Sequence, residues 1–277
     1  MMLQRVKIAE SDKKHIYEKI MMTKAIFNMR MGVVVIVSLI IFLFELIVNQ
    51  HLLVIHNTMG QAQDTQSMVV NLFALSIYTL ILGILPGIPY GFSLLEEKQS
   101  GYLRFKLLRM SPKRYIKNKM LCVAVTGACS VIMPYIIIVA VLLRYGETTT
   151  SQRHMQVLET LVWGKVMYVW NGNFVIFLKG VLLLLFGVFW AEITLLITLF
   201  VHNKYIAFVL PYVIYEIMFF LGKNNVLSLI NPRFMIRYDQ SIERPLWLPF
   251  VCFAIYIFVV LLLNYYIFKR QVKNDKY

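Results

Sequence analysis

Six stretches of mostly apolar residues constrain this chain more than any other feature of its sequence. A helix needs about 20 apolar residues to cross the hydrocarbon core of a bilayer. The stretches cover residues 31–49, 68–92, 120–143, 175–201, 205–222 and 247–268. Because only 15% of the residues are charged and 59% are hydrophobic, the chain has too little polar side chain to coat a soluble globule. We therefore expect an all-α integral membrane protein with six transmembrane helices.

The positions of the lysines and arginines predict the orientation of these helices. With the N-terminus inside, the inner segments carry 20 of the 28 basic residues and the outer segments carry eight. Because basic residues resist translocation, both termini should lie in the cytoplasm. The net charge of +14 then reflects topology and contact with anionic membrane lipids. We expect no nucleic-acid partner, since no basic surface interleaved with aromatic residues is apparent.

Polar segments flank the predicted transmembrane domain of residues 31–268. Residues 1–30 combine apolar residues at helical spacing with several lysines, which predicts an amphipathic helix on the inner membrane surface. Residues 269–277 form a short basic tail in the cytoplasm.

The loop of residues 94–119, between the second and third predicted spans, carries eight of the basic residues. Leu103, Leu107 and Met110 fall on one stripe of a helix, with arginines and a lysine around them. Ser111 and Pro112 then end the stripe. This pattern predicts a short amphipathic helix that docks into a groove on a partner through its leucines.

The segment EEKQSGYLRFKLLRMSPKRYIKNKML resembles the loop that follows the second span of ABC-2 type transporter permeases. The matching positions are Glu96, Glu97, Lys98, Gly101, Leu103, Leu107, Leu108, Pro112, Lys113, Arg114 and Lys119. Tyr102 departs from the pattern, because many members of the family have a small threonine there. The layout of an amphipathic N-terminal helix, six spans and an irregular outer segment before the last span is also similar to that family.

The resemblance implies the membrane subunit of an ABC exporter in the bacterial cytoplasmic membrane, with two ATPase subunits and a second permease copy, identical or related, as partners. The partner ATPase would bind ATP and magnesium. No GxxxxGK[ST] loop occurs in this chain, so we expect no cofactor and no ATP hydrolysis by the chain itself. The residues expected to couple it to the ATPase are Glu96, Glu97, Gly101, Leu103, Arg104, Leu107, Leu108, Pro112 and Arg114.

An intramembrane protease is a second interpretation of the Glu96-Glu97 pair. The Glu96-Glu97 pair is similar to the paired glutamates of CAAX-type membrane proteases, but that site also needs an arginine where this chain has Gly101. None of the five histidines falls in the middle of a predicted span, and neither the histidines nor the three cysteines form a metal-site motif. A polytopic membrane protein that is not coupled to an ATPase remains an alternative.

Two carboxylates inside predicted spans are candidates for a translocation path. Glu192 and Glu216 lie near the middle of the fourth and fifth spans, where an ionised side chain is costly unless it faces protein or water. Either they line a path for a cationic cargo, or they are structural. In the structural case they are protonated or hydrogen-bonded to neighbours such as Thr194, Thr198, Tyr212 or Tyr215.

Glu45 lies near the outer boundary, and we expect it to reach water. The apolar spans favour export of an amphipathic peptide or a lipophilic drug or toxin. Export of a lipid-linked or carbohydrate polymer is the alternative.

Overall fold

The computed structural model describes residues 22–56, 77–145, 172–223, 228–237 and 245–273. All regular elements in these ranges are helical. Five of the helices are long and apolar enough to cross a membrane. They are α2 (Met29–His56), α7 (Pro112–Tyr145), α10 (Gly172–Phe200), α11 (Lys204–Leu221) and α13 (Leu248–Lys273). The chain is therefore an all-α, multi-pass membrane protein.

The second predicted span is not one continuous helix in its described part. It consists of α4 (Ile77–Ile81), a 3-10 turn η2 (Leu85–Gly87) and α5 (Ser93–Gln99), joined by turns. Pro86 and Pro89 explain the break, because a proline has no backbone N–H to donate and its ring crowds the preceding turn. The prediction of one spanning helix over residues 68–92 is therefore not confirmed in the described part of this segment, residues 77–92.

Neighbouring helices satisfy the backbone groups that the break leaves open. The indole of Trp190 donates a hydrogen bond to the carbonyl of Gly83, and the hydroxyl of Tyr215 donates one to the carbonyl of Thr79. Both bonds are buried. An irregular backbone is tolerated at membrane depth only where protein or water supplies such partners. The broken segment is thus held by α10 and α11.

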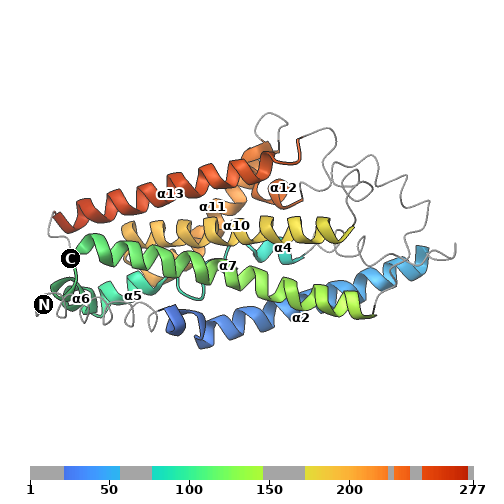
Figure 1. The fold of residues 1–277 in the computed structure, drawn as a ribbon, viewed down its shortest axis with the longest axis horizontal. Helices are drawn as coiled ribbons and strands as arrows, with labels where there is room; N and C mark the ends of the chain where they lie inside the picture. The colour runs from blue at the N-terminus through green and yellow to red at the C-terminus, as the bar shows by residue number, and fades with distance from the viewer. Residues whose placement is uncertain (1–21, 57–76, 146–171, 224–227, 238–244, 274–277) are drawn as a thin grey trace, which may run out of the picture.

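The centre of the molecule is α10, which lies between α7 and α13 in Figure 1. Its apolar side chains form a buried aromatic cluster with α11 and α13. The ring centroids of Trp190 and Tyr215 are 5.4 Å apart, and those of Phe186 and Phe253 are 6.1 Å apart. This cluster fixes α10 against both neighbours.

The two ends of the bundle differ in structure (Figure 1). At one end, which we call the α6 end, α5 and α6 (Tyr102–Arg109) lie near the last turns of α13. At the other end, the α12 end, two short elements follow α11: η3 (Ser228–Ile230) and α12 (Pro232–Ile236). Most residues of α12 are buried.

The flanking segments are described only in part. Residues 22–26 are helical, the chain then bends at Phe27 and Asn28, and α2 begins at Met29. Residues 1–21 of the predicted amphipathic helix and residues 274–277 of the predicted tail lie outside the described residues.

Candidate functional site

The loop between the second and third predicted spans folds into two short helices at the α6 end. Between them Gly101 adopts a left-handed conformation with φ of 71°, which glycine accepts without strain. Met110 is extended, and Pro112 occupies the first position of α7, where its missing N–H costs no hydrogen bond. The chain therefore reverses at Gly101 and turns again before α7, so that α6 packs against both neighbours.

The inner face of α6 is the leucine stripe. Leu103 is only 1% exposed, and Leu107 and Met110 are half-buried against the same cluster. That cluster includes Leu94 of α5 and Tyr115 of α7. The stripe expected to dock on a partner thus packs against the protein itself, because burying it removes apolar surface from water within one chain.

The outer face of α6 is also apolar. Phe105 is 63% exposed and Leu108 is 85% exposed, and Arg104 and Arg109 beside them are exposed as well. Tyr102, the position that departs from the family pattern, is half exposed on the same helix. We call Phe105, Leu108, Arg104 and Arg109 the outer face. A cluster of exposed apolar side chains beside charged ones is typical of an interaction site.

Glu97 holds α5, α6 and α7 together. Its carboxylate accepts hydrogen bonds from Lys106 of α6 at 2.9 Å and from Lys119 of α7 at 2.6 Å. The hydroxyl of Tyr115 donates to the other carboxylate oxygen. Burial acts to raise the pKa of Glu97, but the positive charges and hydrogen bonds outweigh it and hold the pKa below its usual value. Glu97 is therefore ionised and joins the three helices. We call the region where α5, α6 and α7 meet around Glu97 the corner.

Two other predicted coupling residues are Glu96 and Arg114. Glu96 forms an exposed ion pair with Arg30 of α2, with 2.6 Å between the charged atoms. Arg114 is half-buried in the first turn of α7. Sequence reasoning missed Phe105, although its spacing of three residues from Tyr102 and Leu108 was a signal for a second apolar stripe.

The end of α10 is held by side chains from other helices. Lys98 donates to the carbonyls of Thr198 and Leu199 at 3.0 and 3.3 Å, and Gln271 of α13 donates to the Leu199 carbonyl at 2.8 Å. Helix ends leave such carbonyls without partners in their own helix. Burial of the amine lowers the pKa of Lys98 to about 8. Through Lys98, the corner also contacts the C-terminal end of α10.

Glu192 is fully buried in α10, and its partner is on another helix. The amide of Asn264 in α13 donates to Glu192 Oε2 at 2.8 Å and to the Glu192 carbonyl at 3.1 Å. The expected neighbours Thr194 and Thr198 instead donate to carbonyls of their own helix. Sequence reasoning missed Asn264, which is 72 positions away.

Glu216 forms an ion pair with Arg233 of α12. The guanidinium of Arg233 also lies 4.0 Å from the ring centroid of Phe219. Tyr215, an expected partner of these carboxylates, donates to Thr79 instead. The carboxylate of Glu216 is therefore engaged with a short helix at the α12 end rather than standing alone in the bilayer.

Glu45 does not reach water, contrary to expectation. It is buried, and its Oε1 accepts the backbone N–H of Tyr78 at 3.1 Å. Glu45 of α2 therefore contacts the backbone of α4 inside the protein.

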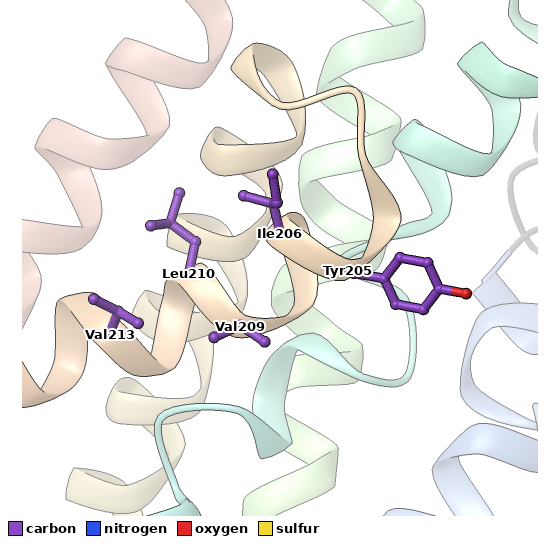
Figure 2. A pocket seen from close by; sticks show the side chains of 5 residues that line it. All are labelled: Tyr205, Ile206, Val209, Leu210 and Val213. Carbon is purple, nitrogen blue, oxygen red and sulfur yellow. The ribbon is translucent and has the colours of Figure 1, made fainter.

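An open apolar hollow of about 360 Å³ lies along α11 (Figure 2). It is lined by Tyr205, Ile206, Val209, Leu210 and Val213. In Figure 2 the side chain of Tyr205 points away from those of Ile206, Leu210 and Val213. The hollow offers apolar contact to a lipid chain, a cargo or another helix.

No protein-family model matches this chain, and no curated protein matches it. Within the described residues, no group of three or more histidine, cysteine or acidic side chains could hold a metal ion. The candidate site is the region where α5, α6 and α7 meet around Glu97, together with the exposed outer face of α6.

Proposed function

We propose that this chain is the membrane-spanning permease subunit of an ATP-driven ABC exporter, and that a separate ATPase subunit docks on the outer face of α6. The observation that supports this most is the asymmetry of α6. One face is fixed to the protein by Leu103, while the opposite face presents Phe105 and Leu108 to the surroundings.

The chemistry of the outer face suggests what the partner offers. Arg104 and Arg109 flank the apolar side chains, and Lys113 and Lys117 of α7 are exposed nearby in the sequence. A matching partner has an apolar groove with acidic residues at its rim. Buried apolar anchors supply most of the affinity in such interfaces, and the charges mainly set orientation and association rate.

The contacts of the corner suit the transmission of force. Glu97 links α6 to α7 by ion pairs, and Lys98 links α5 to the end of α10. A push on α6 therefore acts on two candidate spans at once. In our proposal, closure of the two ATPase subunits on ATP and magnesium moves α5 and α6 and tilts these spans between inward-open and outward-open states.

The orientation follows from the same proposal. The α6 end faces the cytoplasm of a bacterium and the α12 end faces outward, in agreement with the distribution of basic residues. A second permease copy, identical or related, completes the path. The exposed apolar sides of α2, α11 and α13 are available to this copy and to lipid.

For the cargo we propose an amphipathic peptide or a lipophilic drug or toxin. Glu192 is paired with Asn264 and Glu216 with Arg233, so neither supports a path that selects cations. The apolar hollow along α11 suits a lipophilic molecule better than a carbohydrate.

Purification from the native membrane tests the proposal. The tagged wild-type chain should bring down a subunit that hydrolyses ATP, and Leu108→Asp should lose this subunit because it places a charge in the apolar contact. Leu108→Ala should retain it more strongly than Leu108→Asp. If the wild-type chain carries no ATP-hydrolysing subunit, or if Leu108→Asp carries as much as wild type, the proposal is wrong.

A further inference from the structure

Two buried oxygen atoms between α10 and α13 have no hydrogen-bond partner in the described part of the chain. They are Glu192 Oε1 and Asn264 Oδ1, and both residues are fully buried. The same two side chains are already joined through Asn264 Nδ2 and Glu192 Oε2 at 2.8 Å. The unsatisfied atoms are thus the second oxygen of the Glu192 carboxyl and the only oxygen of the Asn264 amide, and the two groups already contact each other.

The chemistry of the two groups identifies what is missing. An ionised carboxylate only accepts hydrogen bonds. An ionised Glu192 would therefore leave Glu192 Oε1 and Asn264 Oδ1 without a hydrogen between them. A neutral carboxylic acid presents one donor and one acceptor, as a primary amide does, so the two groups are complementary along one edge. A proton on Glu192 Oε1 makes that atom a donor, and Asn264 Oδ1 can then accept its hydrogen bond.

The buried or half-buried charged side chains on the surrounding helices contact groups other than the Glu192 carboxyl. On the described elements packed against α10 and α13 they include Lys119 of α7, Glu97 and Lys98 of α5, Glu216 of α11 and Arg233 of α12. Lys119 is paired with Glu97, Lys98 with the end of α10, and Arg233 with Glu216. Among the residues that the structure describes, only Asn264 hydrogen-bonds to the Glu192 carboxyl. A bare carboxylate in this place has no compensating cation among those residues, which strongly disfavours the ionised form.

We propose that Glu192 and Asn264 form a proton-binding site that joins α10 to α13. The bound proton sits on the Glu192 carboxyl, comes from the aqueous phase and makes a neutral acid that pairs with the Asn264 amide. Loss of the proton leaves a negatively charged Glu192 carboxylate beside the oxygen of the Asn264 amide, with no donor between them, and weakens the contact between the two helices. The inference does not depend on the exporter role, because it rests on these two side chains alone.

Infrared spectroscopy of the purified chain in lipid nanodiscs tests the site directly. A protonated carboxyl has a carbonyl stretching band, separate from the amide and carboxylate bands, that shifts in heavy water. We expect this band at neutral pH in the wild type and its loss in Glu192→Gln, which keeps the shape and an amide hydrogen bond. Glu216→Gln is the matched control and should retain the band, because Glu216 is paired with Arg233 and takes no part in the contact with Asn264.

A second variant keeps the test decisive if Glu192→Gln does not fold. Asn264→Leu removes the amide but not the acid, so the band should remain and shift to higher frequency as its hydrogen bond is lost. A wild-type spectrum without an acid band, or a Glu192→Gln spectrum equal to that of wild type, overturns the proposal. So does a carboxylate band that changes between sodium and choline buffers, since a bound cation would then occupy the site. An unshifted band in Asn264→Leu would overturn the pairing.

Discussion

The ammonium group of Lys119 lies 2.6 Å from the carboxylate of Glu97, and the Lys119 side chain is completely buried. Lys119 belongs to α7 and Glu97 to α5, so the pair ties the broken second segment to the third predicted span. Lys106 adds a second cation from α6. Charges taken out of water are stable only when paired, so the corner depends on a single carboxylate.

We predict that Glu97→Gln destabilises the protein by about 3 kcal/mol, because it leaves two cations around a neutral group. Glu96→Gln is the matched control. It breaks only the exposed pair with Arg30 and should cost about 0–1 kcal/mol. Thermal unfolding in detergent measures both. Equal losses in the two variants would contradict a special role for Glu97.

The stability should also depend on pH through Glu97. Its pKa is lower in the folded chain than the usual 4.5, so the unfolded chain binds more protons between the two values. The contribution is fully present above about pH 4.5 and is lost as the pH falls through the lower, folded value. Comparison of wild type with Glu97→Gln over this acid range should show the difference in melting temperature shrinking as the pH falls.

Truncation of a leucine should affect the stability of the protein on one face of α6 and not on the other. Leu103→Ala removes a buried side chain and should cost about 2–5 kcal/mol of stability. Leu108→Ala removes an exposed one and should change stability by less than about 0.5 kcal/mol, with its effect confined to partner binding. Unfolding of the isolated chain measures the first effect. A destabilised Leu108→Ala variant would show that the outer face packs against the chain itself.

Lys98 should make stability rise at alkaline pH. Its pKa is about 8 in the folded chain against 10.5 as the ordinary value, so the unfolded chain binds more protons between these pH values. Folding is therefore favoured progressively as the pH rises from about 8 toward 10.5. Lys98→Met loses the bonds to α10 and this titration. The advantage of wild type over Lys98→Met in melting temperature should widen over the range, and a constant difference would refute the effect.

Gly87 is required by the close approach of the broken segment to α10. A Cβ atom at this position would lie 2.5 Å from Thr194 Oγ1. Gly87→Ala should therefore cost about 1–3 kcal/mol through overpacking, and Thr194→Ala in the same chain should restore part of the loss. Gly32→Ala is the control, because nothing in the described part of the chain lies within 4 Å of its added carbon. Strict additivity of the Gly87 and Thr194 changes would argue against this contact.

The pair of Glu216 and Arg233 should be coupled energetically. Each single neutral variant, Glu216→Gln or Arg233→Gln, strands a partly buried charge, whereas the double variant strands none. A double-mutant cycle should give a coupling of about 1–3 kcal/mol. If Glu216 served cargo rather than structure, Glu216→Gln would impair transport while leaving the melting temperature unchanged.

The sequence alone determined that this chain is helical and membrane-bound. Long apolar segments cannot be solvated, and a backbone in lipid must satisfy its own hydrogen bonds, so the helices follow from composition and length. Pro86 and Pro89 are part of the sequence as well, and they account for the break in the second segment.

Only the tertiary structure decided which surfaces and partners these residues have. Helical periodicity groups Leu103 with Leu107 and Phe105 with Leu108, but both stripes are apolar, and packing against α7 and α13 selected the first for burial. The pairing of Glu192 with Asn264 joins residues 72 positions apart, and local patterns carry no information about which helices become neighbours. The broken second segment likewise persists because Trp190 and Tyr215 reach its open carbonyls from other helices. In each case a local pattern supplies the side chain, and the arrangement of distant helices determines what it contacts.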